Sequence, residues 1–164
     1  MYSNKAAFTV TLAAVVTTLS ACGGGSDEAD DSAAVQWDAA EPCTLADAET
    51  LAPLLTAGAG EGTTAEHEDR RACVWGVAEA LNTVTISTTD APDSGDSLRT
   101  FDVGGLESRV LAESKYHCVL ETTTEAGTLS IETKFGLDAI TNPDRSCERS
   151  VPLAEHVLNQ LNWT

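Results

Sequence analysis

Apolar and polar side chains alternate along four central segments of the chain, at residues 72–77, 82–88, 116–121 and 129–135. A period of two is typical of a strand that buries one face, so each segment is predicted to be a β-strand. Turn-forming residues at 125–127 join the last two segments into an antiparallel hairpin. The apolar side chains predicted to face the core are Cys73, Trp75, Val77, Val84, Ile86, Tyr116, Cys118, Leu120, Leu129, Ile131 and Phe135.

A helical spacing of apolar residues precedes these strands. Thr44 and Asp47 form a helix-starting box in which a hydroxyl is followed by a carboxylate three residues later, and Pro53 must end or kink the helix. Residues 58–64 are rich in glycine and have no apolar pattern, which predicts a flexible loop. Beyond the second strand, residues 90–97 are predicted as a loop that leads to a short edge strand.

A second helix is predicted at the end of the chain, from about Val151 to Asn162. Its apolar positions recur at helical spacing, Ser150 is placed to cap it, and Pro152 is tolerable in its first turn. The whole pattern predicts an α+β domain, an antiparallel sheet with an N-terminal and a C-terminal helix packed on it. An immunoglobulin-like β-sandwich is the alternative, because Trp75 beside Cys73 resembles the core of such domains.

The N-terminal stretch differs from the rest of the chain. Residues 6–19 are uncharged and mostly apolar behind Lys5, as in a secretory signal, and are too few to span a bilayer comfortably. Leu19-Ser20-Ala21-Cys22 resembles the lipobox of bacterial lipoproteins. The resemblance implies that the leader, residues 1–21, is removed and that Cys22 carries a covalent lipid of the palmitate type. The protein is then expected on the outer face of the plasma membrane, with the membrane as its partner through that lipid.

The residues that follow Cys22 are acidic and lack apolar periodicity. We expect residues 22–40 to be a disordered tether and residues 41–164 to be a single globular domain. The carboxylates at residues 27–31 form a self-repelling run without the turn and spacing of a calcium site. The whole chain has 9 basic and 26 acidic side chains and a net charge of −17, which disfavours nucleic acid as a partner.

Four cysteines remain once Cys22 is assigned to lipid. In an oxidising compartment they predict two disulfides, for which three pairings are possible. We favour Cys43 with Cys73 and Cys118 with Cys147, because each pair closes a loop of about thirty residues, worth about 3–4 kcal/mol in the chain-entropy model. Zinc is disfavoured because no C-x-x-C knuckle is present. We expect no metal and no cofactor.

The serines and histidines of the sequence form no recognisable catalytic motif. Ser94 and Ser97 lie in a loop-forming stretch without a G-x-S-x-G nucleophile turn. His67, His117 and His156 fall on separate elements with no His pair at ligand spacing, and the acidic neighbours of His67 indicate a solvated loop rather than a metal site. We therefore predict that the protein is not an enzyme.

A set of short motifs is spread along the chain, namely the lipobox, Pro42-Cys43-Thr44-Leu45, Cys73-Val74-Trp75, Gly105-Leu106, Cys147, Leu153-Ala154 and Leu158. In these motifs the chain resembles an actinobacterial lipoprotein family described as domain of unknown function 3558. The resemblance implies secretion, an acylated cysteine and disulfides, and it brings no catalytic residues.

Our functional expectation is a non-catalytic, lipid-anchored protein of the cell envelope. Its domain would bind a small apolar ligand or an envelope protein partner; a deep apolar pocket favours the former and a flat apolar patch the latter. An envelope hydrolase with an unfamiliar site and a structural surface protein are the alternatives. Trp37 and Trp163, near the two ends of the domain, either cap the core or form an exposed contact patch.

Overall fold

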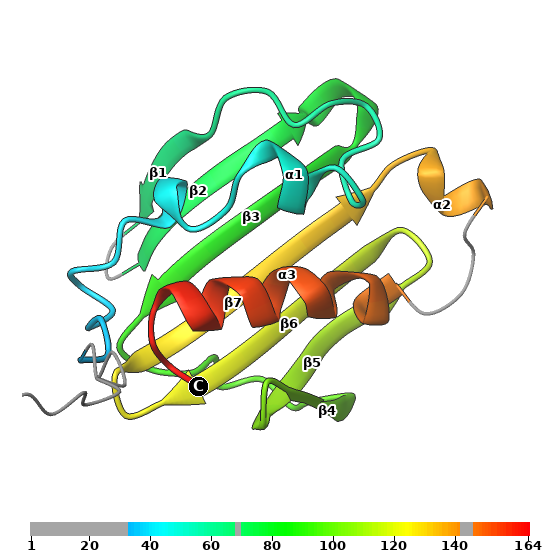
Figure 1. Ribbon diagram of the computed structural model, residues 1–164. Helices are drawn as coiled ribbons and strands as arrows, with labels where there is room; N and C mark the ends of the chain where they lie inside the picture. The colour runs from blue at the N-terminus through cyan, green and yellow to red at the C-terminus, as the bar shows by residue number, and fades with distance from the viewer. Residues whose placement is uncertain (1–32, 68–69, 142–145) are drawn as a thin grey trace, which may run out of the picture. The chain divides into compact units, whose positions relative to one another are not determined.

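The computed structural model describes residues 33–67, 70–141 and 146–164. In these residues one seven-stranded sheet forms, with all neighbouring strands antiparallel, in the order β1-β2-β3-β7-β6-β5-β4 (Figure 1). The strands are β1 Thr63–His67, β2 Arg70–Val77, β3 Asn82–Thr89, β4 Arg99–Val103, β5 Leu106–Ser114, β6 His117–Thr124 and β7 Gly127–Phe135. The sheet thus consists of two meanders, β1 to β3 and β4 to β7, joined where β3 pairs with β7.

Helices cover one face of the sheet. The long helix α3, Ser146–Gln160, lies over β6 and β7, while the 3₁₀ helix η1, Pro42–Thr44, packs on β2 and β3 with the short helix α1, Ala48–Leu51, beside it (Figure 1). A further short helix, α2, spans Asp138–Thr141. The core between this face and the helices includes Leu51, Cys73, Trp75, Val84, Ile86, Leu120, Ile131, Phe135, Leu153, Val157 and Leu158.

The opposite face, which we call the open face, is polar. No helix of the described residues covers it. Strand alternation places on it Thr83, Thr85, Ser87, Arg109, His117, Val119, Glu121, Thr128, Ser130, Glu132 and Lys134. A sheet with one apolar face under helices and one polar face is an α+β arrangement, as expected. The sandwich alternative is wrong for the described residues, because they form a single sheet and Trp75 packs beneath helices.

The four strands predicted from alternation and the short edge strand at β4 are present, but the sheet is larger than expected. Residues 58–64 do not form a continuous loop, because β1 begins at Thr63 and pairs with β2. The nine-residue strand β5 was not predicted at all. Its register with β6 shifts between Val110 and Ala112, and this irregularity interrupts the alternation on which prediction depends.

The first helix begins three residues later than predicted. Asp47, not Thr44, is its N-cap, and its carboxylate accepts the backbone N–H of Thr50 at 2.9 Å. The Thr50 hydroxyl accepts the Asp47 N–H at 3.1 Å, which completes a reciprocal capping box. These contacts hold the pKa of Asp47 below its usual value, chiefly through the Thr50 N–H. Thr44 instead donates its hydroxyl to the Glu41 carbonyl.

The last helix begins earlier than predicted. Because α3 starts at Ser146, Ser150 lies inside the helix instead of capping it, and its hydroxyl is hydrogen-bonded to Thr133 of β7 at 3.0 Å. Pro152 is likewise inside the helix. A proline there leaves one carbonyl of the preceding turn without its helical N–H, and Pro152 is on the exposed side, where water can serve that carbonyl.

Both disulfides join a helical segment to the sheet. Cys43 of η1 is bonded to Cys73 of β2, and Cys118 of β6 to Cys147 in the first turn of α3. This is the pairing that loop length favoured. Each bond therefore fixes a covering segment over one half of the sheet, Cys43–Cys73 over the first meander and Cys118–Cys147 over the second.

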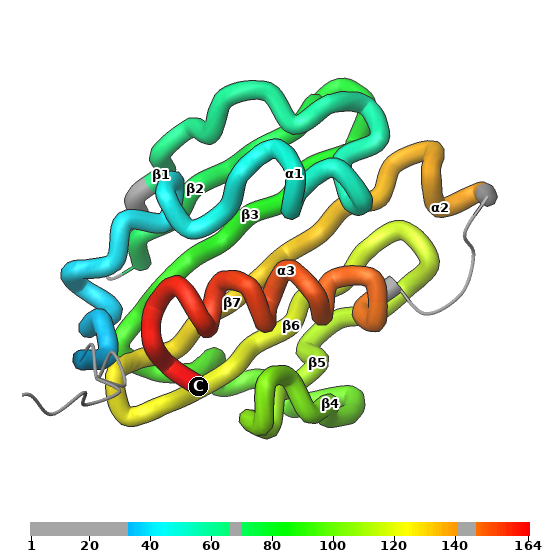
Figure 2. Tube along the Cα trace, in the orientation of Figure 1, coloured from blue at the N-terminus to red at the C-terminus, as the bar shows by residue number. Residues whose placement is uncertain are grey.

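The described chain enters the domain at one end of the sheet, which we call the entry end, defined by residues 35–40 and the β6–β7 turn at Glu125 and Ala126. Val35 donates its N–H to Leu161 and Trp37 to Ala126, while the Trp163 indole donates to the Val35 carbonyl at 2.7 Å. The entering segment, the β6–β7 turn and the C-terminus lie at this one end (Figure 2).

The two tryptophans near the chain ends help to close the entry end. Trp163 is only 6% exposed and Trp37 is half-buried against the core, so they cap it and form no exposed patch. Asn162 adopts a left-handed conformation with φ 54°, and its N–H and that of Trp163 bond to the carbonyls of Asn159 and Leu158. This is the Schellman motif, which turns Trp163 back onto the core.

Candidate binding site

A hollow of about 330 Å³ lies at the end of the sheet opposite the entry end. Its apolar wall comes from three turns that are distant in sequence, namely Ala80 and Leu81 between β2 and β3, Tyr116 between β5 and β6, and Gly136 and Leu137 after β7. The volume is at the lower end of the range of small-molecule pockets, roughly 300–1,000 Å³. We call this end of the sheet the hollow end.

The large apolar side chains around the hollow are unusually exposed to solvent. Leu81 is 67% exposed, Leu137 78% and Tyr116 47%, and Ile140 of α2 follows nearby. These are four of the five large apolar side chains exposed in the described residues, the fifth being Leu98. Scattered single exposed leucines are ordinary, but a group around a concavity marks a contact surface. Tyr116 was predicted to face the core with Cys118; that prediction is wrong, because Tyr116 lies in the turn before β6.

Leu81 is held in a backbone conformation that suits it poorly. The 3₁₀ helix η2, Ala78–Ala80, ends with Leu81 at φ 52°, and the Leu81 N–H bonds to the Ala78 carbonyl. A left-handed conformation costs a residue with a Cβ about 1 kcal/mol or more, and glycine or asparagine adopts it at lower cost. Neither the backbone nor burial explains a leucine at this position. Strain of this kind is typical of sites used for recognition.

Gly136 allows the end of β7 to approach η2. Its φ is 56°, and a Cβ added there would lie 2.4 Å from the Ala80 carbonyl oxygen. This close approach brings Leu137 next to Ala80 at the hollow. The turn is held further by Asp138, whose carboxylate binds Arg149 of α3, and Arg149 in turn stacks over the Phe135 ring at 4.4 Å.

The rim of the hollow on the open face carries charge. His117 and Lys134 are paired across β6 and β7, and both contact Glu132, with His117 Nε2 at 2.9 Å and Lys134 Nζ at 3.3 Å from the same carboxylate oxygen. On the other side Lys115 Nζ lies over the Tyr116 ring, 4.7 Å from its centroid. The hollow is therefore apolar within and polar along its open-face side.

A second, polar hollow of about 250 Å³ lies on the open face itself. Ser87, Ser130 and Thr85 line it with Glu132 and, at the outer strand, Arg70. Glu132 thus lines the polar hollow while it holds His117 and Lys134 at the rim of the apolar one. The two concavities are neighbours on the same face.

A buried ion pair fixes the loop that follows β3. Glu121 is only 2% exposed; one carboxylate oxygen lies 3.0 Å from Arg109 Nη2, and the other accepts the Asp93 N–H at 2.9 Å. Arg109 also donates to the Asp93 carbonyl. These contacts hold the loop at residues 90–98 against the open face, and they explain how a carboxylate is accommodated in a buried position.

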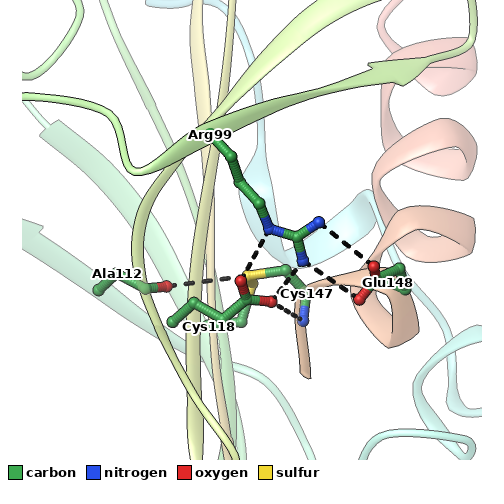
Figure 3. Close-up of polar contacts among 6 residues, drawn as sticks. Arg99, Ala112, Cys118, Cys147 and Glu148 are labelled. Atoms are coloured by element: carbon green, nitrogen blue, oxygen red, sulfur yellow. Dashed lines mark hydrogen bonds and ion pairs between the residues drawn. A yellow bond between two sulfur atoms is a disulfide. The ribbon is translucent and has the colours of Figure 1, made fainter. Parts of the chain in front are cut away.

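The most extensive ion pairing surrounds the Cys118–Cys147 disulfide (Figure 3). Arg99 of β4 binds both carboxylate oxygens of Glu113, at 2.8 and 2.7 Å, and also contacts Glu148 of α3 at 3.3 Å. Glu113 also accepts the Cys147 N–H at 3.2 Å. The cluster joins β4, β5 and the first turn of α3 beside the disulfide.

The electrostatics of this cluster indicate a structural role. The bidentate Arg99 hydrogen bonds lower the pKa of Glu113, and the two glutamates raise the pKa of Arg99. A carboxylate that is held ionised and bidentate by a guanidinium is poorly suited to act as a general acid near neutral pH. The cluster is best read as a clamp on the start of α3.

The residues selected from the sequence lie apart from the hollow, with one exception. Ser94 and Ser97 are exposed in the loop after β3, and His156 is half-buried on α3. His117 alone is at the rim. Cys22, the leader, the acidic residues 27–31 and the side chain of His67 lie outside the described residues. Among those described, no three His, Cys, Asp or Glu side chains gather as a metal site. Nor does the described chain contain a helix long and apolar enough to cross a membrane.

Sequence reasoning missed Leu81 and Leu137 because both lie in turns, outside every periodic segment. A signal was nevertheless present. Leu81 interrupts the junction between two predicted strands, and Leu137 directly follows Gly136 where a strand ends. A leucine in a turn is not explained by core packing, so such positions are candidates for contact with something outside the domain.

Comparison of the chain with protein-family models, with curated proteins and with solved structures found no match. The resemblance to the domain of unknown function 3558 family and to the lipobox stays a prediction.

Proposed function

We propose that this protein is a lipid-anchored binding protein of a bacterial cell envelope, whose domain binds a small apolar ligand without catalysis. The observation that carries the proposal is the hollow, with its three exposed apolar side chains and the strained backbone of Leu81. Burial of such side chains by a ligand offsets the cost of exposing them in the free protein.

The position of the hollow supports anchorage. The chain enters the domain at one end of the sheet, and the hollow lies at the other end. If Cys22 carries lipid, the tether joins the domain through residues 33–40 at the entry end, and the hollow is at the other end of the sheet. A domain held in this way can capture a ligand without obstruction by its own anchor.

The anchor is tested by Cys22→Ser in the full chain. Wild type is expected in the membrane fraction and the variant in the soluble fraction, as measured by membrane sedimentation and immunodetection. Membrane partitioning that persists in the variant would contradict lipidation and indicate an uncleaved transmembrane leader.

The binding site is tested in the same membranes with a neutral photoreactive probe, dodecanol with a diazirine on its alkyl chain. Crosslinks mapped by mass spectrometry are expected on the peptides that contain Leu81, Tyr116 and Leu137. Leu137→Asp should remove most of this labelling because it places a charge in the apolar wall.

The matched control is Leu98→Asp. Leu98 is 64% exposed, similar to the leucines of the hollow, but does not line it. Labelling that is equal in the two variants, or that maps away from the three turns, would contradict the hollow as a binding site.

A further inference from the structure

The charges at the rim indicate what kind of apolar ligand the hollow takes. The chain as a whole is strongly acidic, with a net charge of −17. Of the only two lysines in the described residues, Lys134 nevertheless lines the hollow, and Lys115 lies over the ring of Tyr116, which forms part of its wall. A concentration of lysine at one apolar concavity of an acidic protein is electrostatic complementarity to an anion.

Four of the five described arginines, all except the exposed Arg70, are bound to groups of the fold away from the rim. Arg99, Arg109 and Arg149 are bound to carboxylates that belong to the fold. Arg71 donates to the carbonyls of Asp38 and Ala40 at the entering segment. Lys134 differs from them in exposure, because its side chain is 48% exposed although it contacts Glu132, while the ammonium group of Lys115 lies over the Tyr116 ring.

The acidic groups near the hollow have partners of their own. Asp138 is bound by Arg149, and Glu132 contacts His117 as well as Lys134. The hydrogen bond between His117 and Glu132, at 2.9 Å, gives this carboxylate a contact that does not depend on Lys134. Glu79 of η2 is exposed to solvent, where its charge is screened.

We propose that the ligand is an amphipathic anion, an alkyl chain that lies against Leu81, Tyr116 and Leu137 with a negatively charged head bound by Lys115 and Lys134. This inference rests on the proposed function, because it specifies the ligand of the same hollow. A carboxylate and a phosphate monoester share the required chemistry, since both present several acceptor oxygens to an ammonium group.

The experiment compares three diazirine probes with the same alkyl chain, namely dodecanoate, dodecyl phosphate and the neutral dodecanol. Saturation of labelling at the three turns of the full chain in membranes gives an apparent affinity for each. At least one anionic probe is expected to bind about tenfold more tightly than dodecanol, because an exposed ion pair changes affinity by a few-fold and two lysines take part. The better anion identifies the head group.

Two double variants test whether the preference for anionic probes over dodecanol depends on Lys115 and Lys134. Lys115→Ala with Lys134→Ala should bring the anionic probes down to the affinity that the same variant has for dodecanol, whereas Lys115→Arg with Lys134→Arg should keep the preference. Arg70→Ala, which removes an exposed cation that lines the polar hollow but not the apolar one, is the control and should leave it unchanged.

The outcomes separate the two proposals. Equal labelling of the hollow by all three probes, or a preference that survives both alanine substitutions, overturns the anionic head and leaves the binding site intact. Absence of labelling at the three turns by every probe overturns both.

Discussion

The two ends of the sheet use nearly the same backbone conformation in opposite ways. At the entry end Asn162 has φ 54°, and at the hollow end Leu81 has φ 52°. Asparagine tolerates this conformation and here completes a helix cap that buries Trp163, whereas leucine does not favour it and remains exposed. The side chains of the entry end therefore contribute to stability, while the hollow end retains side chains that stability does not require.

Truncation of one aromatic residue at each end tests this contrast with the largest expected effect. Trp163→Ala should lower the free energy of unfolding by about 3–5 kcal/mol, because it removes a buried ring together with its bond to Val35. Tyr116→Ala should lower it by less than about 1 kcal/mol, because the ring is half in solvent. Urea unfolding followed by circular dichroism measures both free energies. A similar loss of stability in the two variants would contradict the proposed difference between the two ends of the sheet.

Exchange of the residue types at the two left-handed positions tests whether backbone strain differs between the two ends of the sheet. Leu81→Asn should raise the free energy of unfolding by about 1 kcal/mol, because it relieves the strain of a leucine with positive φ. Asn162→Leu should lower it by a similar amount for the converse reason. The same urea titrations apply, and a destabilising Leu81→Asn would mean that the leucine is needed for the fold after all.

Acid is expected to weaken the clamp at the start of α3, near the hollow end, with a smaller effect. The pKa of Glu113 is lower in the fold than in the unfolded chain, so unfolding takes up a proton in the acid range. The stabilisation is thus fully present above the unfolded pKa and is lost as the pH falls through the folded value. Glu113→Gln, measured by unfolding from pH 7 to pH 3, should show a shallower loss than wild type. An unchanged pH profile would assign the acid sensitivity to other carboxylates.

Much of the sheet could be predicted because its central strands alternate strictly. In β3 and β7 the apolar side chains recur at every second position and pack under the helices, while the positions between them are polar, including some that are buried. The edge strand β1 escaped prediction because Thr63, Thr64 and Glu66 are polar on both faces. The strand β5 was not predicted because of its register shift. Ser150 was predicted to cap the last helix because serine is a common N-cap residue, but its hydroxyl is buried and hydrogen-bonded to Thr133 instead.

The hollow could not be predicted from local patterns for a different reason. Its wall is assembled from three turns that only the pairing of β2, β3, β5, β6 and β7 brings together. Alternation even misassigned Tyr116, because its position is in phase with Cys118 and Leu120 although the strand starts one residue later. The disulfide pairing was one of three that the sequence allowed, and the pairing favoured by loop length is the one in the structure.

The join between β3 and β7 has a consequence for how the chain folds. Every other strand pair unites neighbours in sequence, whereas this one pairs Asn82 with Phe135 and Thr89 with Thr128 across the whole second meander. Closure of so long a segment costs more chain entropy than a hairpin and is slower. The two meanders are therefore expected to form first as separate local units. Their union along β3 and β7 is then the late step, at which the hollow is completed from turns of both units.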